Sequence, residues 1–171
     1  MLKVSGRLLA ACVALTALPM LPVPASAAVL GPDAPVCAQG DSPSVLVRVE
    51  GFKARSGLIR VQVYGSNPAD FLAKGKKLKR VELPVSASGP MQICLALPHA
   101  GDIAVAVRHD LDSNGKSGWS DGGGFSRNPS LSMLKLKPDY RDVVVSVGKE
   151  TRVVDVVLKY RDGFSIKPVR S

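Results

Sequence analysis

The stretch that decides the fold is SVLVRVE, residues 44–50. Val45, Val47 and Val49 stand at alternate positions, and the positions between them are polar except for Leu46. A period of two is typical of a β-strand with one buried face and one wet face. We therefore expect these residues to form a half-buried strand with the three valines directed into a core.

Further strand-like runs follow at short intervals along the chain. They cover residues 58–64, 81–85, 91–97, 102–108, 131–137, 143–147 and 153–160. In the first of these, Ile59, Val61 and Val63 form the apolar face, and Pro84 indicates that the second is an edge strand. The last two runs flank a turn at residues 148–150, so we expect them to pair as a closing hairpin.

Sustained helical periodicity is not found anywhere in the chain. The one helical turn we expect covers residues 66–72, where Ser66 or Asn67 is suited to cap it and Pro68 fits the first helical position. Phe71 and Leu72 would then enter the core. Seven or eight short strands with one helical turn predict an all-β fold, an antiparallel β-sandwich.

The first 27 residues have the layout of a cleaved secretory signal peptide. Lys3 and Arg7 precede an apolar run, which ends before the small residues Ala25-Ser26-Ala27. We expect export to the periplasm or beyond and no transmembrane segment in the mature chain. The further division that we predict is a flexible N-terminal arm at 28–43, the sandwich domain at 44–160 and a polar tail at 161–171.

Two cysteines, Cys37 and Cys94, lie beyond the predicted leader. An even number of cysteines in an exported chain favours a disulfide bond between them. Two separate thiols, with that of Cys94 buried in a strand, are the alternative.

The formal net charge of the chain is +9, and part of it is concentrated in one segment. The segment contains Lys74, Lys76, Lys77, Lys79 and Arg80. Export and the lack of interleaved aromatic residues argue against nucleic acid as the partner. Anionic polymers of the envelope, lipid headgroups or another surface partner fit such a charge better, and a solvated connector without a partner is the alternative.

Residues 109–121, HDLDSNGKSGWSD, follow the run at 102–108 and contain the pattern of a calcium loop. Asp110, Asp112 and Asn114 offer oxygens at every second position, and Asp121 stands twelfth when Asp110 is counted first. The backbone carbonyl of Lys116 would be a further ligand.

The neighbouring sequence is strand and glycine loop, so the segment is not an EF-hand. At most it predicts a weak calcium site on a β-scaffold, with a Kd of about 10⁻⁴ to 10⁻³ M. The alternative is a turn in which Asp and Asn side chains accept hydrogen bonds from their own backbone amides.

Three residues of this region are candidate ligand contacts: His109, Trp119 and Phe125. The two aromatic residues would either cover one end of the core or contact a ligand. His109 beside Asp110 suggests catalysis, but adjacent strand residues point to opposite faces, so adjacency does not make a catalytic pair. A hydrolase would need His109 close to a serine or carboxylate from another strand.

The same residues resemble DUF2141, a family of exported bacterial proteins of unknown function. Its pattern matches Ala104-Val105, His109-Asp110, Asn114-Gly115-Lys116 and Gly124-Phe125-Ser126. Phe71-Leu72 and residues 138–142 resemble its other conserved segments, and the similarity covers about Val45 to Leu158.

This resemblance implies a transthyretin-like or prealbumin-like β-sandwich in the envelope and no known activity. The chain departs from the pattern at residues 120–123, where the family often has an acidic segment that contains proline. Together these observations favour a non-enzymatic binding or structural module of the envelope, with calcium as the one cofactor to consider. A basic protein on anionic envelope polymers is the alternative, and a hydrolase that uses His109 is a third.

Overall fold

The computed structural model of the chain describes residues 28–169. The predicted signal peptide, residues 1–27, and the last two residues of the predicted tail lie outside the described residues. Within the described part, no helix is long and apolar enough to cross a membrane.

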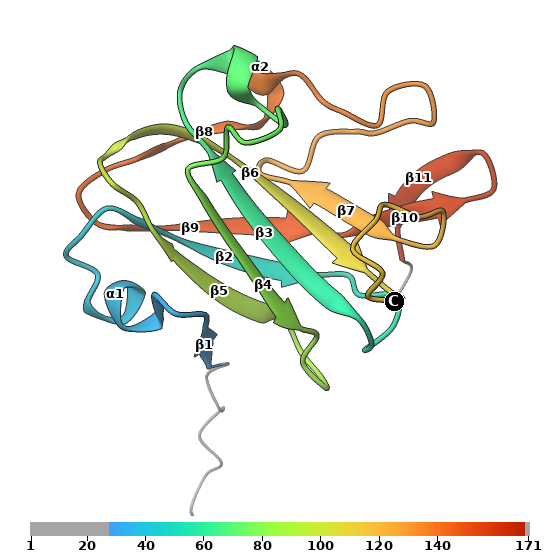
Figure 1. Cartoon of the computed structure of the whole chain (residues 1–171), viewed down its shortest axis with the longest axis horizontal. Helices are drawn as coiled ribbons and strands as arrows, with labels where there is room; N and C mark the ends of the chain where they lie inside the picture. Colours follow the sequence, from blue (N-terminus) through green and yellow to red (C-terminus); the bar gives the residue numbers. More distant parts are fainter. Residues whose placement is uncertain (1–27, 170–171) are drawn as a thin grey trace, which may run out of the picture.

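The chain folds into two β-sheets with a few short helices, as the strand pattern predicts (Figure 1). The first sheet has four strands in the order β1-β5-β2-β9, and the second has the order β11-β10-β7-β6-β3-β4, with β8 paired to β6. The strands are β1 (Val29–Leu30), β2 (Ser44–Glu50), β3 (Leu58–Tyr64), β4 (Lys79–Pro84), β5 (Met91–Ala96), β6 (Gly101–Asp110), β7 (Gly122–Phe125), β8 (Val144–Val147), β9 (Thr151–Val157), β10 (Lys159–Asp162) and β11 (Ser165–Pro168). The helices are α1 (Ala34–Gln39), α2 (Tyr140–Val143) and the 3₁₀ turn η1 (Pro68–Asp70).

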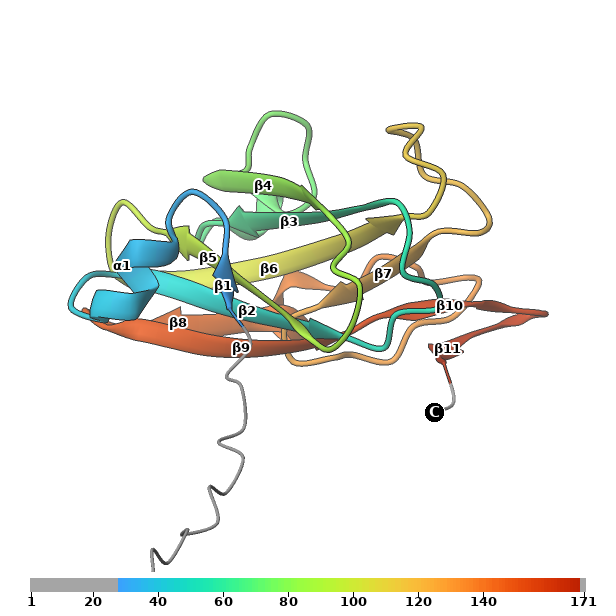
Figure 2. The same ribbon diagram turned by 90° about the horizontal axis from the view of Figure 1, so that it is seen from below.

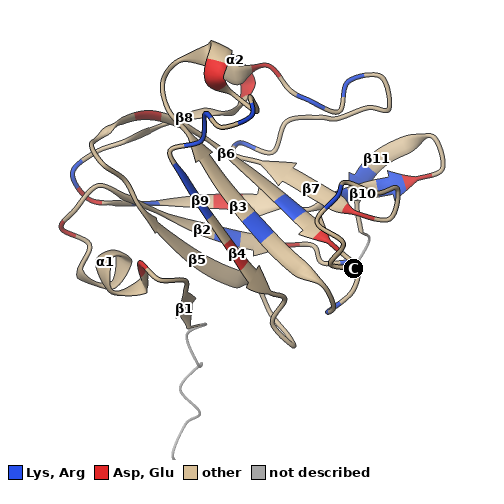
Figure 3. Cartoon of the chain, viewed as in Figure 1, with Lys and Arg blue, Asp and Glu red and all other residues tan. Residues whose placement is uncertain are grey.

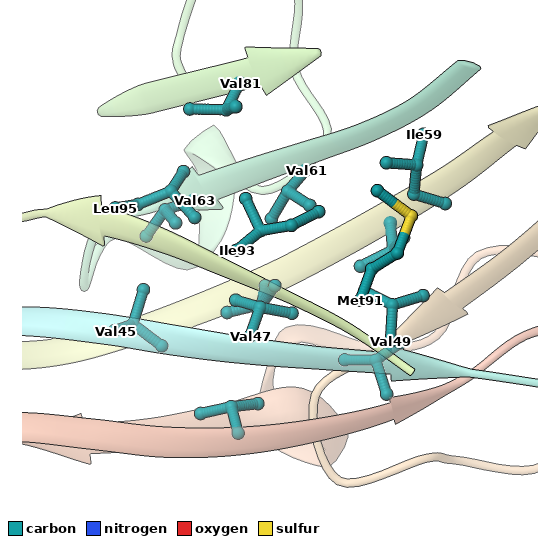
Figure 4. Close-up of a cluster of buried hydrophobic side chains, with 14 of the residues drawn as sticks. Val45, Val47, Val49, Ile59, Val61, Val63, Val81, Met91, Ile93 and Leu95 are labelled. Carbon is teal, nitrogen blue, oxygen red and sulfur yellow. The ribbon is translucent and has the colours of Figure 1, made fainter. Parts of the chain in front are cut away.

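The core lies between the two sheets, which are stacked face to face (Figure 2). The predicted inward residues of β2 and β3 meet there and are fully buried: Val45, Val47, Val49, Ile59, Val61 and Val63. Met91, Ile93 and Leu95 of β5 interdigitate with them (Figure 4). β4 is an edge strand, as Pro84 predicts. Burial of these apolar side chains is the main force that holds the sheets together.

The helical turn at residues 66–72 is confirmed as η1, and Asn67 is its cap. The Asn67 side-chain oxygen accepts a hydrogen bond from the Ala69 amide at 3.1 Å. Phe71 follows and makes edge contacts with Tyr64, Phe125 and Tyr140, with ring centroids about 6 Å apart. Phe71 therefore packs in an aromatic group beside the core.

The predicted disulfide between Cys37 and Cys94 is confirmed, but the arm that contains Cys37 is not loose. β1 pairs in parallel with β5, and α1 ends at Gly40, whose φ of 74° is the left-handed conformation that glycine adopts without strain. The Asp33 carboxylate accepts hydrogen bonds from the Ala96 amide at 2.9 Å and from Lys79. These contacts fix residues 29–39 against the sheet. Hydrophobic periodicity does not predict them.

Three other expectations were wrong in detail. Residues 143–147 and 153–160 do not form a hairpin, because β8 joins β6 while β9 joins β2 in the other sheet, in parallel. Residues 131–137 form a loop with one bridge, Ser132 to Ser165. Leu131, Met133 and Leu136 line a surface cavity and Leu134 is exposed, so the segment has no face directed into the core. Most of the predicted polar tail belongs to the β10–β11 hairpin.

Candidate functional site: a cavity beside the 110–121 loop

β7 has the sequence Gly-Gly-Gly-Phe and lies between β6 and β10. Two of its glycines, Gly122 and Gly124, are needed because this face of the strand runs close to the core. A Cβ on Gly124 would lie 2.6 Å from a Val156 methyl group and 2.8 Å from the Val157 carbonyl oxygen. A Cβ on Gly122 would overlap the Tyr160 ring. The glycines therefore allow β7 to close the sheet where a larger residue would not fit.

His109 of β6 and Tyr160 of β10 meet over Gly122. Both residues are register partners of Gly122, one from each side, and both are buried. His109 Nδ1 lies 2.6 Å from the Tyr160 hydroxyl, and Nε2 lies 2.8 Å from the Ser56 carbonyl oxygen. A carbonyl only accepts, so the proton sits on Nε2 and Nδ1 accepts from Tyr160. The hydroxyl in turn accepts from the Lys53 amide at 3.2 Å.

This arrangement removes His109 from the candidate ligand contacts. The residue does not line the cavity, and its hydrogen-bond partners are a tyrosine and a backbone carbonyl. Among the described residues it makes no hydrogen bond to a serine hydroxyl or a carboxylate. The catalytic pair that a hydrolase would need at His109 is therefore not formed here. The hydrogen bonds of His109 instead link β6 to β10 and to the loop before β3.

Asp110 is the buried anchor of the loop that follows. Its carboxylate accepts hydrogen bonds from the Gly115 amide at 2.9 Å and from the Asn114 amide at 3.2 Å, and it pairs with Arg108 at 2.7 Å. Burial alone would raise its pKa. The amide hydrogen bonds, the contact with Asp112 and the Arg108 charge outweigh burial and lower the pKa of Asp110 below its usual range.

The other predicted loop ligands also bond within the loop. Asp112 accepts from the amide and the side chain of Asn114, and the Asn114 side chain accepts from the Lys116 amide at 2.7 Å. Asp121 accepts from the Leu111 and Gly118 amides at 3.2 and 2.8 Å. The geometry is that of a self-bonded turn. It nevertheless brings carboxylate oxygens of Asp110, Asp112 and Asp121 within 4.8 Å of one another.

A cavity of about 370 Å³ lies on the outer face of the β7–β10–β11 part of the second sheet. Phe125, Arg161 and Ile166 belong to its floor. Its walls are the end of the loop, residues 117–121, and the loop at 131–136, which contributes Leu131, Met133 and Leu136. The lining is mostly apolar with a few charged groups, which is the usual make-up of a small-molecule site.

Trp119 and Arg161 form one side of this cavity together. The guanidinium carbon of Arg161 lies 3.5 Å from the centroid of the Trp119 ring, although 72 % of the Trp119 surface is exposed. Arg161 also donates from Nε to the Gly163 carbonyl at 3.0 Å. This cation–π contact orients an aromatic ring that has little other support. Trp119 and Phe125 both line the cavity, and their role as ligand contacts stays a prediction.

Lys159 is the second cation of the cavity. Its ammonium group donates to the carbonyls of Asn128, at 3.2 Å, and of Pro129. Burial lowers its pKa. Sequence analysis missed Lys159 and Arg161 as site residues. The sequence shows Lys159 and Arg161 on either side of Tyr160, which places them on the opposite face of a strand from Tyr160. It does not indicate which loops cover the face that contains the two cations.

Acidic side chains pair with several cations of the basic segment at 74–80 and offset part of its positive charge. Lys79 pairs with Asp33 at 2.9 Å, Arg80 with Glu82 at 3.0 Å, and Lys76 approaches Asp70 at 4.0 Å. Figure 3 shows this mixing of signs on β3 and β4, where Glu82 also pairs with Arg60. These ion pairs weaken the case for a polymer-binding surface in this segment.

The fold and the cavity define a class of protein: an all-β domain of two packed sheets with a loop-framed cavity outside one of them. The model of the family DUF2141, described as an uncharacterized protein conserved in bacteria, matches residues 47–155. The chain belongs to this family. The matched region contains the loop and β7 but ends before Tyr160 and Arg161.

No curated protein and no solved structure matches the chain. The two-sheet architecture is confirmed by the fold itself. The narrower expectation of a transthyretin-like sandwich stays a prediction.

Proposed function

We propose that this protein is an exported, non-enzymatic binding module of the bacterial envelope and that the cavity beside Trp119 is its ligand site. The observation that carries the proposal is the mostly apolar lining of this cavity, which two loops build on the face of a rigid sheet. Binding residues are often placed on loops that a rigid scaffold positions. The disulfide and the signal-peptide pattern support export.

The proposal is tested with 1-N-phenylnaphthylamine, a small apolar dye that fluoresces when it leaves water. We expect the purified protein to bind the dye. We expect Met133→Lys, which places a charge in the cavity wall, to weaken binding at least tenfold. Leu78→Lys is the matched control, because Leu78 is also partly exposed but lies outside the cavity. Equal binding by both variants, or none by the native protein, would reject the cavity as the site.

Export is tested separately by cell fractionation. We expect the chain in the periplasmic or extracellular fraction with an N-terminus at Ala28. An intact leader on soluble protein in the cytoplasm would contradict the proposal.

A weak calcium site in the loop is the second candidate, favoured by the mutual distance of the Asp110, Asp112 and Asp121 oxygens. With a Kd near 10⁻⁴ M, about 1 mM calcium would stabilise the fold by about 1.4 kcal/mol. The test is a thermal melt in calcium and in EDTA. A rise in Tm that disappears in Asp112→Ala supports the site, and superimposed melts reject it. Asp112 is chosen because it is exposed, whereas Asp110 also anchors the loop.

A further inference from the structure

Large apolar side chains are exposed mainly around the mouth of the cavity. In the described part of the chain the exposed ones are Leu78, Trp119, Leu134, Leu136, Val153, Phe164 and Val169. Trp119 and Leu136 line the cavity itself, and Leu134 lies in the same loop as Leu136. A concentration of this kind on a soluble domain marks an interaction site.

The most exposed of these side chains stand at the tips of separate loops. Leu134 is fully exposed in the 131–137 loop, and Phe164 is 94 % exposed in the turn between β10 and β11. The bridge between Ser132 and Ser165 holds these two segments side by side. Figure 1 shows that the loop after β6 and the β10–β11 hairpin extend at the same end of the molecule.

Basic residues occur in the same segments as these tips and in the 110–121 loop on the other side of the cavity. They are Lys116, Lys135, Lys137 and Lys167. Lys116 and Lys137 form no ion pair among the described residues, whereas Lys135 pairs with Asp139 at 2.8 Å and Lys167 with Asp162 at 2.6 Å. Unpaired lysines beside apolar tips are complementary to a surface of anionic headgroups. The exposed Trp119, which lines the cavity, is suited to the membrane interface, where an amphipathic indole ring is favoured.

We propose that this end of the protein docks on an anionic phospholipid membrane. Leu134 and Phe164 enter the interfacial region, and Lys116 and Lys137 contact headgroups. The mouth of the cavity then faces the lipid. The proposal rests on the proposed function in one respect, because the apolar ligand of the cavity is then an acyl chain of the docked surface.

The experiment is co-sedimentation of the purified protein with vesicles of phosphatidylglycerol and phosphatidylethanolamine, compared with vesicles of phosphatidylcholine alone. We expect binding to the anionic vesicles, weaker binding at high salt, and a shift of tryptophan emission to shorter wavelength. The shift reports on Trp119 alone, because the chain contains one tryptophan. The double variant Leu134→Ser with Phe164→Ser should bind at least tenfold more weakly.

The matched control is the double variant Leu78→Ser with Val153→Ser, which removes two exposed apolar side chains that do not frame the cavity. We expect it to bind like the native protein, and thermal melts verify that both double variants fold. A native protein that stays in the supernatant, or equal binding by both double variants, overturns the proposal.

Binding of the apolar dye separates this proposal from the proposed function. Dye binding without vesicle binding overturns membrane docking and leaves the cavity as a ligand site. Vesicle binding without dye binding supports docking and rejects the cavity.

Discussion

The Tyr160 hydroxyl donates a hydrogen bond to His109 Nδ1 at 2.6 Å, although their strands are not neighbours in the sheet. β7 lies between the two strands, and the residue that separates the two side chains is Gly122. The contact is possible because glycine has no side chain to fill the space. It makes one buried polar group out of residues from β6, β10 and the loop that contains Lys53 and Ser56.

Tyr160→Phe should destabilise the fold by about 1–2 kcal/mol, because it leaves His109 Nδ1 and the Lys53 amide without their partner. Urea denaturation measures the change. Tyr140→Phe is the matched control, because the buried Tyr140 hydroxyl has no hydrogen-bond partner within residues 28–169. Removing it should leave stability unchanged or raise it. Equal losses of stability in the two variants would contradict a stabilising role for the hydrogen bonds of the Tyr160 hydroxyl.

Stability should fall as the pH rises from about 10 to about 12. Burial raises the pKa of Tyr160 to about 12, above its ordinary value of 10.0. The unfolded chain therefore loses this proton at a lower pH than the folded chain, so alkali favours unfolding. Denaturation at a series of pH values measures the slope. Tyr160→Phe should flatten it but not abolish it, because burial also raises the pKa of Tyr64 and Tyr140.

Gly122→Ala should cost about 1–3 kcal/mol, because the added methyl group overlaps the Tyr160 ring and the strand must shift. Gly123→Ala is the control on the opposite face of β7, where a Cβ would lie 3.4 Å from the Val107 carbonyl oxygen, an ordinary contact. Its effect should stay within about 0.5 kcal/mol. Thermal melts of the two variants give the comparison. Tolerance of alanine at both positions would mean that β7 is not closely packed.

Asp110→Asn should destabilise the fold by about 3 kcal/mol, because Arg108 then loses its buried partner. Asp112→Asn, in the exposed part of the same loop, should cost about 1 kcal/mol or less. The lowered pKa of Asp110 also predicts an acid response. Its contribution is present above about pH 4 and is lost as the pH falls through the folded-state pKa. Loss of stability below pH 4 should therefore be smaller in Asp110→Asn than in the native protein.

Sequence reasoning was accurate where one face of a strand is fully buried. β2 and β3 begin and end at the predicted residues, because Val45, Val47 and Val49 and their counterparts in β3 all point into the core. Two predictions from residue type were also confirmed: Asn67 caps the predicted turn, and Cys37 pairs with Cys94.

The errors have a common physical origin in contacts between distant segments. Gly122 to Phe125 has no apolar alternation, and it is a strand only because its backbone pairs with β6 and β10. Leu131, Met133 and Leu136 belong to a strand-like run in the sequence but line a cavity. The sequence therefore predicts only part of the candidate site. It indicates the loop and Trp119, whereas the floor at Lys159 and Arg161 depends on which strands become neighbours.

The parallel pairing of β9 with β2 has a consequence for biogenesis. Ser44 and Thr151, 107 positions apart, share a hydrogen bond at 2.8 Å at one end of that pair. A growing chain cannot complete the four-stranded sheet until residues 151–157 have been synthesised. The fold of the nascent polypeptide therefore stays incomplete until late in translation. Folding is also slow, because the long stretch of chain between β2 and β9 must close into a loop before the two strands can pair. In the export that we propose, this topology would keep the chain incompletely folded, and so able to pass a narrow secretion channel, until β9 is available.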